Sequence, residues 1–157
     1  MKEIAVNKLW REAAMAEASA IDRRFSVSPQ LLETDFAFAA QQGFKSIINL
    51  RPDGEAGVYP TARQAEKMAR ANGLEYGYVP VKRSGVEPQQ VAAFKRFFRE
   101  LPTPILAYCS TGRRAALMWA LAWVGKGDVD DVLAGCEKAG HDLETIRPLL
   151  ESIAAET

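Results

Sequence analysis

The segment 109–114, with the sequence Cys-Ser-Thr-Gly-Arg-Arg, brings together a thiol, two hydroxyls, a glycine and two guanidinium groups. It follows a short apolar run at 105–108 and precedes a helical pattern from residue 113, so we expect a strand, a loop and a helix. A thiol at a helix N-terminus feels the positive end of the helix dipole and nearby amide donors, which lower its pKa and favour the nucleophilic thiolate. The segment therefore predicts a nucleophile, Cys109.

The rest of this segment has the chemistry of an anion-binding loop. Glycine allows backbone conformations closed to other residues, so that successive N–H groups can surround a tetrahedral anion. Arg114 offers a fork of donors that matches phosphate or sulfonate oxygens, and a neighbouring hydroxyl, Ser110 or Thr111, can hydrogen-bond the sulfur. The alternative is a buried structural cysteine followed by two solvated arginines, but this combination in this context favours the functional interpretation. We predict Cys109 and Arg114 as catalytic residues, with anion binding by Ser110, Thr111, Gly112, Arg113 and Ala115.

Four further residues have weaker signals. Arg51 and Asp53 lie in an Arg-Pro-Asp-Gly turn after the apolar run 46–50 and are possible secondary site residues, although Asp-Gly is also common in turns for local reasons. Cys136 fits a small packing residue of a helix better than a resolving thiol. His141 follows a glycine and is expected at a helix end, and nothing in the sequence places it beside Cys109.

The elements that must position these residues alternate along the chain. Apolar runs predict strands at 25–27, 46–50, 74–81 and 105–108, with Pro80 near the end of an edge strand. Helical patterns and capping signals predict helices at 36–40, 61–72, 88–101, from 113 onward, 128–138 and 143–155. This alternation predicts a three-layer α/β fold with a mainly parallel sheet flanked by helices. Ligands of such folds bind beyond the carboxyl ends of the strands, where the turns after Leu50, Val81 and Tyr108 meet.

Length and composition limit the possible functions. The 157 residues fit one domain, and 20 basic against 20 acidic residues argue against broad binding to nucleic acid or anionic membrane surfaces. Two cysteines and one histidine make a poor zinc site and a poor disulfide framework, so we expect no metal, no cofactor and a cytoplasmic setting. The longest apolar stretch, 115–124, is about half of a membrane span. Ala18-Ser19-Ala20 looks like a signal-peptidase site, but charged residues interrupt the preceding segment, which we interpret as an amphipathic helix.

Four stretches resemble a known family, the phosphatase-like domain of β-lactamase-hydrolase-like proteins, which is also labelled a sulfur transferase family. They are 25–31, 43–55, 78–81 and 106–114, and the resemblance covers about residues 24–125. It implies a fold like that of the dual-specificity protein tyrosine phosphatases. Residues 1–23, expected to form a helical N-terminal extension, and the C-terminal helices of 126–157 lie outside the match.

The resemblance leaves two chemistries open. Tyrosine phosphatases place five residues between the cysteine and the arginine and usually carry histidine before the cysteine, whereas here four residues separate Cys109 from Arg114 and Tyr108 comes first. Four is the spacing of many rhodanese-type sulfurtransferases. A phosphatase also needs a general acid. The expected position, after the strand at 74–81, reads Lys-Arg-Ser-Gly, which leaves Asp53 or Glu55 as substitutes.

We therefore expect a sulfurtransferase that moves sulfane sulfur from thiosulfate or a persulfide to a thiol or cyanide through a Cys109 persulfide. Sulfite leaves without a proton, so this reaction needs no acid. The alternative is a Cys-dependent phosphatase that uses the same loop for a phosphoester substrate. A second alternative is a catalytically silent anion-binding module. In the enzymatic cases the partner is a small molecule, and the oligomeric state stays open.

Overall fold

The computed structural model describes residues 18–156 and contains one five-stranded sheet in the order β1-β2-β5-β3-β4. The last four strands in this order run parallel, whereas β1 pairs antiparallel with β2. The expected α/β class, with a mainly parallel sheet between helices, is confirmed. The strands are β1 (Ser19–Ala20), β2 (Phe25–Ser28), β3 (Ser46–Asn49), β4 (Glu75–Tyr78) and β5 (Ile105–Tyr108).

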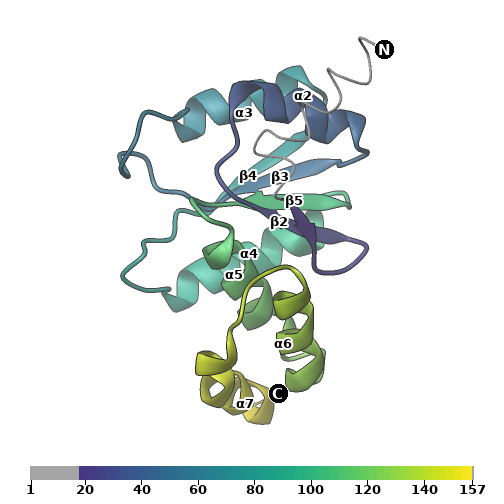
Figure 1. The fold of residues 1–157 in the computed structure, drawn as a ribbon, viewed down its shortest axis with the longest axis vertical. Helices are drawn as coiled ribbons and strands as arrows, with labels where there is room; N and C mark the ends of the chain where they lie inside the picture. Colours follow the sequence, from purple (N-terminus) through teal and green to yellow (C-terminus); the bar gives the residue numbers. More distant parts are fainter. Residues whose placement is uncertain (1–17, 157) are drawn as a thin grey trace.

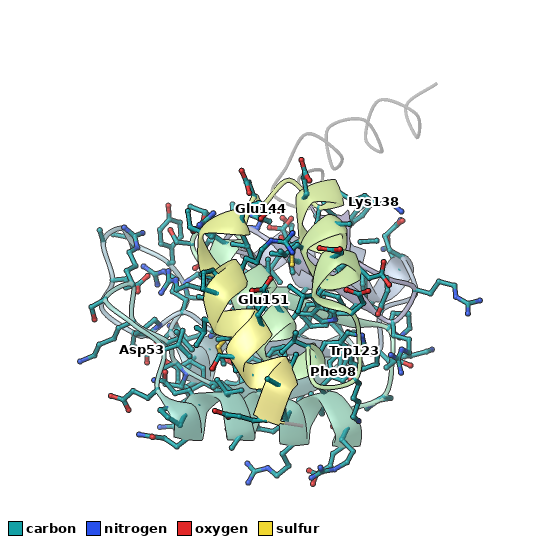
Figure 2. The ribbon with its side chains drawn as sticks, turned by 90° about the horizontal axis from the view of Figure 1, so that it is seen from below. Asp53, Phe98, Trp123, Lys138, Glu144 and Glu151 are labelled. Carbon is teal, nitrogen blue, oxygen red and sulfur yellow. The ribbon has the colours of Figure 1, made fainter. Side chains whose placement is uncertain are left out.

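Helices cover both faces of the sheet (Figure 1). One face carries α2 (Glu33–Gln41) and α3 (Ala62–Ala71), and the other carries α4 (Pro88–Glu100) and α5 (Arg113–Trp123). A further helical layer packs on α5 and consists of α6 (Val129–Lys138), a 3-10 turn η2 (Glu144–Ile146) and α7 (Arg147–Glu156). This layer lies in front when the molecule is seen from below (Figure 2).

The side chains of the central strands explain why the sheet is covered twice. All residues of β2, β3 and β5 are buried, as expected for parallel strands between two helical layers. Successive residues face opposite sides, so Ile47 packs in the core under α2 and α3, and Ile48 packs in the core with α4 and α5. Trp119 and Trp123 stack with ring centroids 6.2 Å apart. Trp119 is buried in the same core as Ile48, and the partly buried Trp123 packs against that core.

Local signals set most of the element boundaries. Thr61 and Gln64 form the expected capping box, in which the Gln64 amide donates to Thr61 Oγ1 at 3.2 Å and the Thr61 amide donates to Gln64 Oε1 at 2.9 Å. Pro88 occupies the first position of α4, where its missing N–H is not needed. The predicted helices and central strands therefore lie where the sequence patterns put them.

Two predictions about the ends of elements need correction. β4 ends at Tyr78 instead of Val81, because Pro80 has no N–H for the ladder, although the Val81 amide still donates to the Leu50 carbonyl at 2.9 Å. The helical extension predicted for residues 1–23 does not include Ser19 and Ala20, which pair with β2 as β1. The amphipathic helix expected further upstream lies outside the described residues. Among residues 18–156, no helix has the length and apolar character needed to cross a bilayer.

Candidate functional site

The loops that follow β3, β4 and β5 meet at the carboxyl ends of these strands, because the strands are parallel and adjacent (Figure 1). The loop after β5 contains the predicted nucleophile, and we call residues 109–112 the cysteine loop. It lies over the middle of the sheet, since β5 is flanked by β2 and β3. Figure 2 shows Asp53 on one side of the molecule and the aromatic residues Phe98 and Trp123 toward the other.

Cys109 lies at the base of this loop and is fully buried. Its amide donates to the Ser28 carbonyl of β2 at 3.4 Å, and its sulfur accepts a hydrogen bond from the Gly112 amide at 3.1 Å. We predicted a hydroxyl as the partner of the sulfur, but the donor in the structure is the backbone N–H of Gly112. The loop therefore curls around the sulfur with a backbone amide directed at it.

Gly112 makes this curl possible. It is the N-cap of α5 and has φ +92°, a left-handed conformation that favours glycine. A Cβ at this position would lie 3.1 Å from His141 Nε2 and 3.4 Å from the Ser28 carbonyl carbon, so a side chain would also meet neighbouring atoms. The position thus requires glycine for both backbone and steric reasons.

Arg114 is held in place from two other loops. Its Nη1 donates to the Val81 carbonyl at 2.7 Å and to Glu55 Oε2 at 2.6 Å, and its Nη2 donates to Glu55 Oε1 at 2.9 Å. Burial acts to lower the pKa of Arg114, but the hydrogen-bonded ion pair with Glu55, together with the neighbouring Cys109, outweighs it and raises the pKa. The guanidinium is therefore a fixed cation within electrostatic reach of the Cys109 sulfur.

Glu55 is the residue whose importance the sequence understated. The hydrogen bond from Arg114 is the main reason that its pKa lies below the ordinary value, and Arg83 and Arg51 act in the same direction. Both carboxylate oxygens accept from Arg114, so Glu55 is an ionised acceptor and a poor proton donor. The sequence named it only as a substitute acid, because no local pattern links it to an arginine 59 residues away.

Arg51 and Asp53 organise the loop that carries Glu55. The buried Arg51 guanidinium donates to the carbonyls of Glu55 and Ala56 at 2.8 and 3.1 Å and lies over the Tyr59 ring, 4.9 Å from its centroid. Asp53 Oδ1 accepts from the Ala62 amide at 2.8 Å and so caps the start of α3. In this structure both residues are positioning groups for the loop, and their hydrogen bonds do not reach Cys109.

The two hydroxyls and the second arginine of the site have partners of their own. Ser110 Oγ accepts from Arg83 Nη2 at 3.0 Å, and Thr111 Oγ1 accepts from the Arg113 amide at 3.3 Å. We predicted that Arg113 points into the anion cradle beside Arg114, but its Nη1 donates to the Asp142 carbonyl at 3.0 Å. Neighbouring helix residues are rotated by about 100°, so they do not share one face. Ala115, also predicted for the site, is fully buried in the core.

The C-terminal helices bring two residues near the back of this region. His141 Nε2 approaches Gly112 closely, which the sequence did not indicate, and burial, assisted by Arg113, lowers its pKa, so the ring is neutral at pH 7. Cys136 is fully buried, and burial raises its pKa to about 12. Its sulfur lies 3.7 Å from the Ala116 carbonyl, in keeping with the predicted packing role.

Comparison with known proteins shows the family to which the chain is related. Residues 17–126 match the family described as beta-lactamase hydrolase-like protein, phosphatase-like domain. A beta-lactamase hydrolase-like protein from Agrobacterium fabrum is 33% identical over 120 residues, which cover 73% of this chain and 28% of that relative. The chain therefore spans less than a third of the length of this relative.

Solved structures give the same picture. A protein from Neisseria meningitidis, nma1982, named a "putative phosphatase", is 30% identical, has a TM-score of 0.78 and covers 87% of this chain and 98% of its own. The Tk-PTP structure, with a TM-score of 0.67 over 89% of this chain and 97% of its own, is 17% identical and shares the fold. These names point to phosphatases, so they support the phosphatase alternative better than the sulfurtransferase that we expected.

Proposed function

Because this chain belongs to the family of the phosphatase-like domain of beta-lactamase hydrolase-like proteins, we propose that it is a Cys109-dependent phosphatase. The observation that carries this proposal is the combination of two features: the buried Cys109 sulfur accepts a hydrogen bond from the Gly112 amide at 3.1 Å, and Glu55 fixes Arg114 nearby. The thiol supplies a nucleophile, and the loop amides and Arg114 supply donors for a tetrahedral anion. These groups supply the nucleophile and the anion site for phosphoryl transfer through a cysteine, whereas no general acid is assigned.

The reaction has two steps. The Cys109 thiolate attacks phosphorus, an S–P bond forms, and the bond between phosphorus and the leaving oxygen breaks, with its electron pair leaving on that oxygen. Water then attacks the phosphocysteine, the S–P bond breaks, and the thiolate returns as inorganic phosphate departs. The loop amides and Arg114 stabilise the charge of the equatorial oxygens in both transition states. The Glu55 ion pair keeps Arg114 oriented, which reduces the reorganisation needed at each step.

Sulfur transfer is the second candidate, and the four-residue spacing between Cys109 and Arg114 favours it. In that reaction the thiolate attacks the outer sulfur of thiosulfate, sulfite leaves with the electron pair of the S–S bond, and a Cys109 persulfide passes its sulfur to a thiol or cyanide. The same amides and guanidinium would stabilise the departing sulfite. The phosphatase takes precedence because the family and the more similar structures carry phosphatase names.

A paired assay separates these reactions. Hydrolysis of p-nitrophenyl phosphate and formation of thiocyanate from thiosulfate and cyanide are measured with the unmodified chain, Cys109→Ser and the control Cys136→Ser. We expect phosphate release that is lost in Cys109→Ser and kept in Cys136→Ser, because the Cys136 thiol is buried and protonated. Cys109-dependent sulfur transfer without phosphate release would overturn the proposal in favour of the second candidate. If the unmodified chain shows neither activity, the result would indicate an anion-binding module.

A further inference from the structure

The loop after β4 presents a cation to the cysteine loop. Arg83 is exposed, and its Nη2 donates to Ser110 Oγ at 3.0 Å, across 27 residues of sequence. In the phosphatase fold that this chain resembles, the general acid is expected in this loop. Here its residues 82–85 read Lys-Arg-Ser-Gly. At this position the chain thus places a guanidinium where a proton donor was expected.

Arg83 differs from the other three guanidinium groups near the site. Arg114 is ion-paired with Glu55. Arg51 donates to two carbonyls and also lies 3.7 Å from Glu55 Oε1, and Arg113 donates to a third carbonyl. Within residues 18–156, no carboxylate lies within ion-pair distance of Arg83, whose guanidinium donates to the neutral Ser110 hydroxyl. A guanidinium can bind a phosphate through two parallel charge-assisted hydrogen bonds, whereas the hydroxyl offers one neutral acceptor, so an anion that reaches Ser110 can displace this hydroxyl.

The carboxylates of the neighbouring loop already have hydrogen-bond partners. Glu55 is ionised and bound to Arg114, and Asp53 Oδ1 accepts from the Ala62 amide. An alkoxide leaving group would need a proton in the transition state, whereas a phosphate leaving group departs as a stable anion. A cation beside that group neutralises its growing charge without any proton transfer.

We propose that the substrates are phosphoanhydrides, in which the phosphoryl group to be transferred is joined to a second phosphate, and that Arg83 binds this second phosphate as the specificity-determining residue. The inference rests on the phosphatase function proposed above. Cys109 attacks the terminal phosphorus, the S–P bond forms, and the bond to the bridging oxygen breaks. The electron pair leaves on that oxygen as part of the second phosphate, which stays bound to Arg83. Water then releases the first phosphate and regenerates the thiolate.

The test compares three substrates with different leaving groups: inorganic pyrophosphate, β-glycerophosphate and p-nitrophenyl phosphate. Phosphate release is measured with the unmodified chain, Arg83→Gln and Arg99→Gln. Arg99 is an exposed residue near the C-terminal end of α4, so its variant removes the same charge away from the cysteine loop. We expect kcat/KM for pyrophosphate to exceed that for β-glycerophosphate at least about tenfold. We expect Arg83→Gln to lower the pyrophosphate value by about tenfold, because KM rises as the contact with the second phosphate is lost and kcat falls as the growing charge of the leaving group loses its cation. We expect a clearly smaller factor for p-nitrophenyl phosphate.

Each outcome has a distinct meaning. Cys109-dependent hydrolysis of p-nitrophenyl phosphate without preference for pyrophosphate over β-glycerophosphate would overturn the inference and leave the phosphatase standing. Equal losses for pyrophosphate and p-nitrophenyl phosphate in Arg83→Gln would also overturn it, because Arg83 would then support the loop and not the second phosphate. Failure to release phosphate from any of the three substrates would overturn the phosphatase proposal and this inference with it. A similar effect in Arg99→Gln would show that the overall charge, and not the position, determines the preference.

Discussion

Replacing Glu55 by glutamine tests whether the ion pair with Arg114 holds the site together. Arg114 Nη1 and Nη2 donate to Glu55 Oε2 and Oε1 at 2.6 and 2.9 Å. The side chain of Glu55 is 17% exposed and that of Arg114 is 10% exposed. Removal of one partner from a fully buried pair costs about 3–5 kcal/mol. Because this pair is partly exposed and glutamine keeps one acceptor oxygen, we expect Glu55→Gln to lower the free energy of unfolding by about 2 kcal/mol at pH 7.

The same variant should change the pH dependence of stability. The pKa of Glu55 in the folded chain lies below its ordinary value of 4.5, chiefly because Arg114 donates to the carboxylate. The stabilisation is therefore complete above pH 4.5 and is lost as the pH falls through the lower, folded-state pKa. The difference between the unmodified chain and Glu55→Gln should accordingly shrink as the pH falls below 4.5.

The assay is urea unfolding followed by tryptophan fluorescence, at pH 7 and at a series of lower pH values. Glu66→Gln is the matched control, because Glu66 also pairs with an arginine, Arg70 at 3.2 Å, but with side chains 45% and 53% exposed. We expect this exposed pair to contribute about 0.5 kcal/mol or less. The reasoning is refuted if the two variants lose equal stability at pH 7, or if the Glu55→Gln difference stays constant down to pH 3.

Three further predictions concern residues around the cysteine loop. Gly112→Ala should lose about 1–3 kcal/mol of stability and most Cys109-dependent activity, because its Cβ would lie 3.1 Å from His141 Nε2. The control Gly73→Ala also has a positive φ, +75°, but its Cβ would meet no atom within 4 Å, so this variant should keep its activity. Tyr108→Phe should raise the free energy of unfolding by about 1 kcal/mol in urea titrations, because the buried Tyr108 hydroxyl has no hydrogen-bond partner in the part of the chain that the structure describes; a loss would contradict this. In the Cys109→Ser variant, Cys136 should resist iodoacetamide at pH 8 in the native state and react in urea, as measured by intact mass, because burial raises its pKa to about 12; rapid native labelling would disprove this.

The order of elements and the cysteine loop were predictable because both depend on local patterns. Runs such as Ile105–Tyr108 are apolar throughout, which is the pattern of a parallel strand buried on both faces, and the structure buries all four residues. The capping box of Thr61 and Gln64 fixed a helix start from residues three apart. The two-residue strand β1 escaped prediction, because so short a segment has no periodicity and is defined by its pairing with β2.

The site itself was predictable only where it is continuous in sequence. The pair of Glu55 and Arg114 joins residues 59 apart, and His141 reaches Gly112 from the C-terminal helices, so neither contact leaves a local signature. The direction of Arg113 was mispredicted, because sequence proximity to Arg114 suggested a shared target that helix geometry separates. Long-range packing thus determines which of the many arginines face the sulfur.

The same long-range contacts explain how a chain with zero net charge can build a strongly cationic site. The formal charges balance over the whole chain, yet four arginines, at positions 51, 83, 113 and 114, lie in or contact the loops at this edge of the sheet. Glu55 forms ion pairs with Arg114 and, at 3.7 Å, with Arg51, and backbone carbonyls bind Arg51 and Arg113. This division of partners leaves Arg83, on a neutral hydroxyl, as the cation that an incoming anion can recruit at the smallest cost to the fold. Substrate selection should therefore respond mainly to mutation of Arg83 and stability mainly to mutation of Glu55. Because Arg83 also helps to lower the pKa of Glu55, the stability of the double variant should differ from the sum of the two single effects by the coupling between these residues.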